Sequence, residues 1–382
     1  MPRTAPIYLD YLSTTPVDPL VLEEMLPYFS VNFGNTGSPH FYGWEAGNAV
    51  RRARDRVASL IAADPGDVIF TASASEANNL AIRGVYTAAG KAGGRIITSS
   101  IEHSSVRAAC EAMARSGAEL VMIPNDGYGR LDVGALELAL DAPAVLVSIQ
   151  HANNEIGTVQ DLPAISSLCR ARGVLLHTDA AQSAGKIPLD VSALGADLLT
   201  FSAHKMYGPK GAAALFIRPG RPRIHLEPIV EGGGQERGLR AGTLNVPAIV
   251  GFGKAAELAR ALLPDEVFRL GSLRDRCETG LREIDPTARF NGHPAQRLPG
   301  ATSVTFPGRR ADRLLRALKG IAISSGSACA SDEAGPSRVL TSIGLFAEDA
   351  AATLRLCFGR PSGETDLHTA LDEFRRVLSA SA

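Results

Sequence analysis

The chain has 382 residues, of which 39 are Lys or Arg and 40 are Asp or Glu, so its formal charge is −1. This balance gives no electrostatic reason to expect nucleic acid or a membrane surface as an obligatory partner. The N-terminal residues lack the apolar run of a signal peptide, and no segment reaches the roughly 18 apolar residues of a membrane helix. We therefore expect a cytoplasmic protein that is long enough to bury a sizeable core.

Residues 65–220 alternate between short apolar runs rich in Val, Ile and Leu and stretches with a helical period. This alternation predicts an α/β domain whose mostly parallel, seven-stranded sheet is covered by helices on both faces. The predicted strands are 67–73, 95–100, 118–124, 144–150, 174–180, 196–202 and 211–217.

The pattern changes after a loop-rich region and a long helical stretch at 245–284. Beyond it, strand-like runs at 301–308, 321–325 and 353–359 alternate with helical segments, which indicates a smaller α+β domain. We expect a large domain at 16–255, a small C-terminal domain at 256–382, and an N-terminal segment, 1–15, that packs with the small domain.

The five cysteines are an odd number and lack metal-ligand spacing. Four of them, Cys110, Cys169, Cys277 and Cys357, lie in predicted helices or strands, where a cysteine is usually a small buried hydrophobe. Cys329 is different, because it lies in SSGSAC (324–329) among small residues that cannot build a core.

Polar side chains gather where predicted strands end. His103, Asp179 and Lys205 each come at or just after the end of such a strand. The first strand leads through Ala74 and Ser75 into a helix, so backbone N–H groups and a hydroxyl lie at a helix N-terminus, which favours phosphate. Because ligands of open α/β sheets bind beyond the carboxyl ends of the strands, we expect these groups to meet at one edge of the sheet.

Together these groups suit pyridoxal 5′-phosphate. Its aldehyde needs an amine such as Lys205, its ring nitrogen needs a carboxylate such as Asp179 to stay protonated, and its flat ring can stack on His103. Gln182 is placed to hydrogen-bond the ring oxygen. The residues that add to the phosphate site are Ser202 and His204.

Each of these features also has an ordinary structural explanation. His103 can be a loop histidine, Asp179 a helix cap, Lys205 a solvated lysine before a turn, and Ser75 an ordinary N-cap before Glu76. The prediction of a cofactor site rests on their common position at one edge of one sheet.

The sequence resembles the cysteine desulfurases of the NifS/IscS type, class V members of the fold-type-I pyridoxal-phosphate enzymes. The resemblance covers nearly the whole chain, from YLDYLSTTPVDP (8–19) to LRLCFGR (354–360), with the motifs in family order. The other matching motifs are FGN (33–35), EHSSV (102–106), NNEIG (153–157), HTDAAQS (177–183), FSAHKMYGPKG (201–211), GGGQERGLRAGT (232–243) and SSGSAC (324–329).

The resemblance implies a role for each matching residue. Lys205 is implied to be the Schiff-base lysine, and His103 to stack on the ring and shuttle protons. Asp179 is implied to pair with the ring nitrogen and Gln182 with the phenolic oxygen. Thr243 is implied to reach the phosphate from a second subunit, so that a homodimer is the functional unit. The remaining implied contacts are Ala74, Ser75, Ser202 and His204 at the phosphate, Asn154 at cofactor and substrate, and Asn35 and Arg355 at the substrate carboxylate.

Cys329 is implied to be the nucleophile. Its thiolate would take the sulfur of L-cysteine as a persulfide, leave L-alanine, and carry the sulfur to an acceptor protein. The acceptor pathway stays open between iron–sulfur cluster assembly, tRNA thiolation and DNA phosphorothioation. We expect no metal in the isolated chain, although Cys329 can complete an iron–sulfur site in a complex.

Two alternatives remain. One is another class V enzyme with the same cofactor, an aminotransferase or a selenocysteine lyase. The other is a non-catalytic protein that keeps the fold as a docking platform. Cys329 argues against a transaminase, which needs no thiol, and the joint presence of Lys205 and Cys329 argues against a non-catalytic role.

Overall fold

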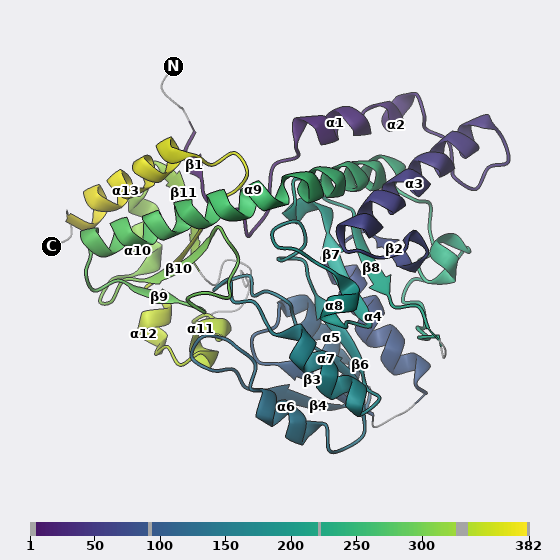
Figure 1. The fold of residues 1–382 in the computed structure, drawn as a ribbon, viewed down its shortest axis with the longest axis horizontal. Helices are drawn as coiled ribbons and strands as arrows, with labels where there is room; N and C mark the ends of the chain where they lie inside the picture. Colours follow the sequence, from purple (N-terminus) through teal and green to yellow (C-terminus); the bar gives the residue numbers. More distant parts are fainter. Residues whose placement is uncertain (1–4, 91–93, 221–222, 326–334, 380–382) are drawn as a thin grey trace.

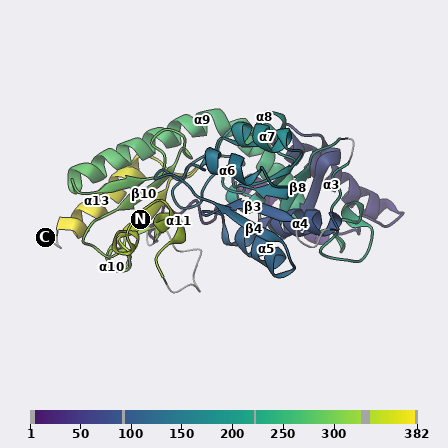
Figure 2. The ribbon, with the colours of Figure 1, turned by 90° about the horizontal axis from the view of Figure 1, so that it is seen from below.

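The structure of the chain is a computed structural model that describes residues 5–90, 94–220, 223–325 and 335–379. It has two parts joined by one long helix, α9 (Val246–Ile284), which runs along both of them (Figures 1 and 2). The first and the last labelled elements, β1 (Ile7–Tyr8) and α13 (Glu364–Ser379), both lie in the smaller part in Figure 1. Within the described residues, no helix is long and apolar enough to span a membrane.

A seven-stranded sheet forms the centre of the larger part, in the order β2-β8-β7-β6-β5-β3-β4. The fold class predicted from the sequence is confirmed, and every predicted run contains one strand. The strands are β2 (Val68–Thr71), β3 (Arg95–Ser99), β4 (Glu119–Ile123), β5 (Ala144–Ser148), β6 (Leu175–Asp179), β7 (Leu198–Ser202) and β8 (Ala213–Ile217).

Strand β8 is the exception to the parallel arrangement, because it pairs antiparallel with both β7 and β2. Its connection explains the direction. Only residues 203–212 separate β7 from β8, and they hold a single 3₁₀ turn, η2 (Ala203–Lys205). A parallel return needs a crossover of a dozen or more residues, so the short link sends β8 back antiparallel. That turn carries Lys205.

Helices cover both faces of the large sheet, and three apolar clusters fill the layers between. The N-cap of helix α4 (Ala74–Ala88) is Ser73 and not Ser75, so that structural alternative for Ser75 is wrong. Ser73 Oγ accepts from Glu76 N at 3.1 Å, and Glu76 Oε2 accepts in return from Ala72 N at 3.0 Å, an arrangement similar to a capping box. The other helices and turns of this part are α1 (Pro19–Met25), α2 (Pro27–Ser30), α3 (Phe41–Leu60), η1 (Pro65–Asp67), α5 (Ser104–Arg115), α6 (Val133–Ala139), α7 (Leu162–Ala171), α8 (Val191–Leu194) and η3 (Gln235–Gly238).

The smaller part is built on an antiparallel sheet in the order β12-β13-β10-β9. A parallel pair, β1–β11, joins the N-terminal segment to it, which supports the proposed packing of that segment with the small domain. The elements are β1 (Ile7–Tyr8), β9 (Arg289–Asn291), β10 (Ala301–Thr305), β11 (Ile321–Ala322), β12 (Ser324–Ser325), β13 (Thr353–Cys357), α10 (Ala311–Ala317), α11 (Arg338–Ser342), α12 (Ala347–Ala350) and α13 (Glu364–Ser379).

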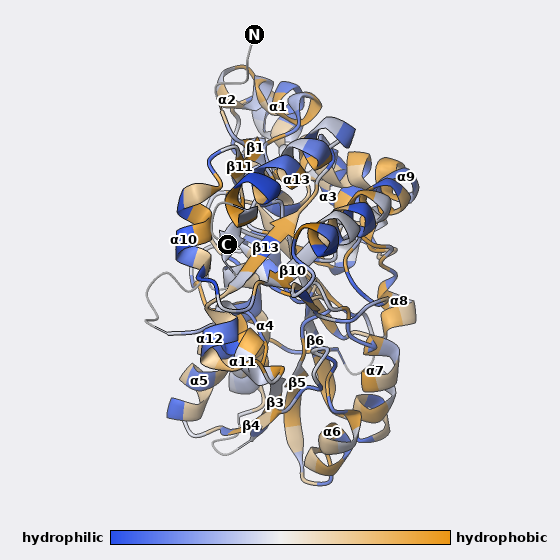
Figure 3. Ribbon diagram, turned by 90° about the vertical axis from the view of Figure 1, so that its left-hand side faces the viewer, coloured by the Kyte–Doolittle hydropathy of each residue, from blue (hydrophilic) through white to orange (hydrophobic). Residues whose placement is uncertain are grey.

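Helix α9 belongs to both parts. Its first half contributes Phe252 and Ala255 to a core cluster of the large part, and its second half contributes Leu273 and Leu281 to the core of the small part. Hydrophilic and hydrophobic residues alternate along α9 and α13 in Figure 3, as amphipathic packing requires. These clusters support the proposed division near residue 255, which falls inside a continuous helix rather than in a linker.

Candidate active site

A cavity of about 190 Å³ lies where strands β5, β6 and β7 end and helix α4 begins. Nine of the residues predicted from the sequence line it, although they are spread along the chain from Ala74 to Lys205. These are Ala74, Ser75, His103, Asn154, Asp179, Gln182, Ser202, His204 and Lys205. The remaining lining residues are Ser73, Gln150, Ala152 and Ala181.

Asp179 is held as a hydrogen-bonded carboxylate at the end of β6. It is 7% exposed, its Oδ1 accepts from Ala181 N at 2.9 Å, and its Oδ2 accepts from Asn78 Nδ2 at 2.8 Å. Both oxygens of this buried carboxylate are thus paired with donors, which fixes its position at the strand end. Asn78 also donates to Ser105 Oγ at 2.9 Å, which links the carboxylate to the His103 turn.

His103 caps helix α5 through Nδ1. Ser105 N donates to this nitrogen at 3.2 Å, and Ser105 Oγ lies 2.8 Å from it. Because the backbone donor occupies Nδ1, the neutral ring carries its proton on Nε2. Burial lowers the pKa of His103, while Asp179 raises it and Lys205 lowers it further, so the ring is neutral near pH 7.

The turn after β7 brings Lys205 and His204 against the N-terminal segment. Lys205 Nζ donates to the backbone carbonyls of Leu12 at 2.6 Å and Ser13 at 2.7 Å. His204 Nδ1 lies 3.0 Å from Thr14 Oγ1. Burial, with the nearby positive charges of Lys205 and two other lysines, lowers the pKa of His204 to about 4. A neutral imidazole at this place can donate one hydrogen bond to an anion.

The cavity has the polar groups that a phosphate needs. Ser202 Oγ is buried and has no hydrogen-bond partner among the described residues. The first N–H groups of α4, at Ala74 and Ser75, are not used within the helix, and the helix dipole favours an anion there. An unsatisfied buried hydroxyl beside free N–H groups fits the phosphate of pyridoxal phosphate, as Asp179, His103 and Lys205 fit its ring and aldehyde.

Arg355, predicted to bind the substrate carboxylate, lies behind the cavity wall rather than in it. Its guanidinium is fully buried, with Nη1 donating to the carbonyl of Asn154 at 2.7 Å. Nη2 donates to Asp10 Oδ1 at 2.8 Å and Ser13 Oγ at 2.6 Å. These bonds use three of the five N–H donors of the guanidinium, and Nε has no hydrogen-bond partner in the described part of the chain.

Three other predicted residues are not part of the cavity lining. Asn35 is exposed, and its Oδ1 accepts from Gly37 N at 3.0 Å. Thr243 is exposed on the loop before α9. Cys329 lies outside the described residues.

Sequence reasoning missed two groups that shape the cavity. Asn78 is fully buried on α4, and an amide on the apolar face of a helix is the signal that identifies it. Glu102 is buried next to His103 and accepts from Ser99 Oγ at 2.7 Å and from Gln150 N at 2.9 Å. Burial raises the pKa of Glu102 to about 8, although both hydrogen bonds lower it.

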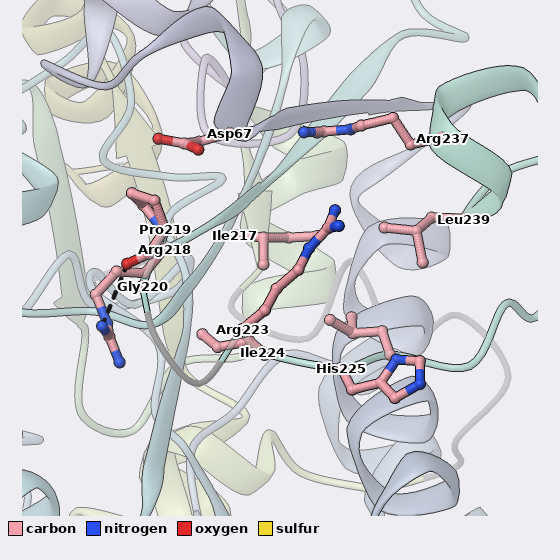
Figure 4. Close-up of a pocket in the computed structure, with 11 residues that line it drawn as sticks. Asp67, Ile217, Arg218, Pro219, Gly220, Arg223, Ile224, His225, Arg237 and Leu239 are labelled. Atoms are coloured by element: carbon pink, nitrogen blue, oxygen red, sulfur yellow. Dashed lines mark hydrogen bonds between the residues drawn. The ribbon is translucent and has the colours of Figure 1, made fainter.

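A larger hollow of about 680 Å³ lies elsewhere on the large part, and Figure 4 shows its side chains. Arg218, Arg223 and Arg237 line it together with Asp67. No residue of the predicted site contributes to it.

Comparison with known proteins agrees with the fold and the family. The family model of the class-V aminotransferases matches residues 7–369. A protein named cysteine desulfurase IscS, from Shewanella sp. strain W3-18-1, is 46% identical over 376 residues, which are 98% of this chain and 93% of that protein. The structure of a NifS-like protein, 33% identical, superimposes with a TM-score of 0.92 over 98% of this chain and 100% of that one. A structure of SspA in complex with cysteine, 36% identical, covers 92% of this chain and 98% of that one, with a TM-score of 0.81.

The fold and the cavity define an α/β enzyme that depends on pyridoxal phosphate. The chain belongs to the aminotransferase class-V family and, within it, to the cysteine desulfurases. The activity predicted from the sequence is therefore confirmed at the level of the reaction, and so is the cofactor.

Proposed function

We propose that this cysteine desulfurase moves the sulfur of L-cysteine to Cys329 as a persulfide and releases L-alanine. The observation that carries the proposal is the meeting of nine predicted residues on one cavity, with Asp179, His103 and Lys205 among them. When bound, pyridoxal phosphate supplies an electron sink that stabilises negative charge on the substrate during the reaction.

Asp179 and the phosphate cradle hold the cofactor in this proposal. The carboxylate of Asp179, fixed by Asn78 and Ala181, keeps a proton on the ring nitrogen. Ser75 and Ser202 hold the phosphate with the N-terminus of α4. These contacts orient the reacting groups and raise the effective concentration of substrate beside the catalytic side chains.

Lys205 and His103 carry out the proton transfers in this proposal. The amine of Lys205 is the base that takes the α-proton of the substrate. His103 donates from Nε2, since its Nδ1 is occupied by Ser105. With a pKa below its ordinary value, His103 is neutral near pH 7 and exchanges protons without a large penalty.

Arg355, Asn35 and Asn154 hold the substrate carboxylate in this proposal. The planar guanidinium of Arg355 suits a two-point contact with a carboxylate. Its hydrogen bond to the carbonyl of Asn154 places it directly behind the cavity wall. The structure of SspA in complex with cysteine supports cysteine as the ligand of such a site.

Cys329 completes the reaction. Its thiolate sulfur bonds to the substrate sulfur, the carbon–sulfur bond breaks, and the carbon takes a proton. One L-cysteine and one thiol thus give one L-alanine and one persulfide, with no external oxidant or reductant.

Replacement of Cys329 tests this assignment. We expect Cys329→Ser to bind L-cysteine but to lose transfer of sulfur to the protein, measured as alanine released and as persulfide trapped by alkylation. Cys110→Ala is the matched control, because Cys110 is buried and burial raises its pKa to about 12. Release of alanine by Cys329→Ser at the wild-type rate contradicts the assignment, and formation of a new amino acid from an added keto acid favours the aminotransferase alternative.

We further propose a homodimer, and an exposed apolar surface supports it. Five large apolar side chains on α2, α3 and the loop between them are each more than half exposed, an unusual concentration for a monomer. They are Phe29, Val31, Phe33, Phe41 and Trp44. Thr243 is also exposed and lies outside the cavity of its own chain, as a residue that serves the partner's site requires.

The persulfide of Cys329 passes to an acceptor protein. The relatives named IscS favour the iron–sulfur pathway over tRNA thiolation and DNA phosphorothioation. The proposal places the enzyme in the cytoplasm, where acceptor thiols stay reduced, with no direct contact to nucleic acid or membrane. Isolation of the persulfidated enzyme with its bound acceptor, followed by mass spectrometry, identifies the pathway.

A further inference from the structure

Lys186 follows Gln182 by four residues and contacts it twice. Its Nζ donates to the backbone carbonyl of Gln182 and to the side-chain oxygen Oε1, both at 3.2 Å. The turn that allows these contacts passes through Gly185, whose φ of +72° favours glycine. A Cβ at Gly185 would also lie 3.0 Å from Met206 Cβ and 3.1 Å from Ala259 Cβ. The backbone is thus built to bring Lys186 back onto Gln182.

The amine of Lys186 determines how the amide of Gln182 is oriented. An ammonium has donors only, so the amide must present Oε1 to it and turn Nε2 away. Nε2 donates to the carbonyl of Leu12 at 2.9 Å. Lys205 Nζ donates to the same carbonyl at 2.6 Å. The donor end of Gln182 therefore lies beside the catalytic lysine.

Both contacts with Gln182 can form whether or not Lys186 is charged. The residue is partly exposed, but burial of its amine lowers its pKa to about 7, helped by Lys205 and Arg355 and opposed by Cys357. A neutral amine keeps two N–H bonds, which suffice for the two contacts with Gln182. The arrangement is retained in both protonation states.

We propose that Lys186 is a positioning residue that holds the amide of Gln182 with its N–H donors directed to the cofactor's phenolic oxygen. The inference rests on the proposed function, in which Gln182 contacts that oxygen. Lys186 itself touches no reacting atom. Without the donors of Lys186, only the Leu12 carbonyl orients the Gln182 amide. The amide is then held less firmly with Nε2, the end that binds an anionic oxygen, toward the cavity.

A double-mutant cycle on the full-length enzyme tests the inference. We would measure the dissociation constant of pyridoxal phosphate by reconstitution of the apoenzyme, and record the visible spectrum against pH. We expect Lys186→Met to weaken cofactor binding by about 3- to 10-fold, the usual value of one hydrogen bond. In a Gln182→Leu background the same change should have no further effect, because the residue through which it acts is absent. Lys186→Arg, which keeps donors, should restore most of the affinity.

Lys254→Met is the matched control, since Lys254 is a partly buried lysine of the same domain that pairs with Glu257 outside the cavity. Equal losses from Lys186→Met in both backgrounds, or none in either, overturn the inference. If Lys186→Met does not fold, Lys186→Gln is carried through the same cycle. This test measures cofactor binding. The proposed function is tested separately, because it fails if the wild-type enzyme releases no alanine from cysteine.

Discussion

His177 joins three strands of the large sheet through a fully buried ring. Its Nδ1 lies 2.8 Å from Ser148 Oγ on β5, and its Nε2 lies 3.1 Å from Thr200 Oγ1 on β7. Burial lowers the pKa of His177 to about 4, whereas the unfolded chain titrates near 6.5. The unfolded state therefore binds more protons between these values, and the stability contributed by the neutral ring, complete above pH 6.5, is lost as the pH falls towards 4.

We expect His177→Gln to reduce the acid sensitivity of the apoenzyme. The wild type should lose about 2 kcal/mol more of its free energy of unfolding than the variant between pH 7 and pH 5. Denaturant unfolding at the two pH values measures the difference, and His368→Gln, at an exposed histidine of α13, is the control. The interpretation fails if the wild type and His177→Gln lose the same amount.

At the residue scale, the polar residues that follow the strands could be predicted from the sequence. The residues that hold these side chains in place could not. Asp179, His103 and Lys205 were predictable because parallel strands bring their carboxyl ends to one edge. Asn78 was not, because its role depends on the rotation of α4 against β6. The fully buried, paired state of Arg355 was equally out of reach, since Asp10 lies 345 residues away along the chain.

At the scale of elements, a buried carboxylate helps to attach the loop at η3 to the edge strand β2, where Arg237 also donates to the carbonyl of Val68. Glu236 and Arg237 have φ of +45° and +60°, a region that disfavours side chains. Glu236 accepts from Phe70 N at 2.8 Å and from Arg54 at 2.8 and 2.6 Å. The side chains of Arg54 and Glu236 are only 19% and 2% exposed, so this contact fixes the loop that leads to Thr243.

We expect Arg54→Met to destabilise the protein by about 3–5 kcal/mol, because it leaves the buried charge of Glu236 without its partner. Adding Glu236→Gln should recover part of the loss, since the amide oxygen still accepts from Phe70 N and carries no charge. Arg56→Met, which breaks more exposed pairs with Glu24 and Glu257, should cost no more than about 1 kcal/mol. Denaturant unfolding measures all three, and equal losses from the two arginine variants contradict the expectation.

Elements themselves were largely predictable, and the differences have clear causes. The runs of the large sheet are rich in apolar residues, and all except the edge strand β4 are buried along most of their length, as is typical of strands covered on both faces. The direction of β8 was not expected, because it depends on the length of a connection rather than on the strand. The division near residue 255 does not appear as a break in the chain, because α9 keeps one helical pattern while it packs on two cores.

At the scale of the whole molecule, the proposed dimer predicts that an active site is completed by the partner chain. Thr243 is exposed and outside its own cavity, whereas Lys205 lines that cavity. In a mixed dimer of a Lys205→Ala chain and a Thr243→Val chain, the site that keeps Lys205 receives an intact Thr243 only if the threonine comes from the partner. We therefore expect the mixed dimer to release alanine at up to about half the wild-type rate, while each variant alone is strongly impaired, since one of the two equivalent sites of a two-fold dimer is restored.

Co-expression of the two chains with different affinity tags, followed by tandem purification, isolates the mixed dimer for this measurement. The double variant Lys205→Ala/Thr243→Val paired with a wild-type chain is the control, because its one site with Lys205 lacks the partner's threonine and should stay impaired. If Thr243 acts within its own chain, the result reverses: the first mixed dimer stays inactive and the control recovers.

The exposed apolar side chains of residues 29–44 allow the same dimer to be tested by measuring the molecular mass in solution. We expect Trp44→Glu to place a charge in the interface and to shift the protein towards monomers.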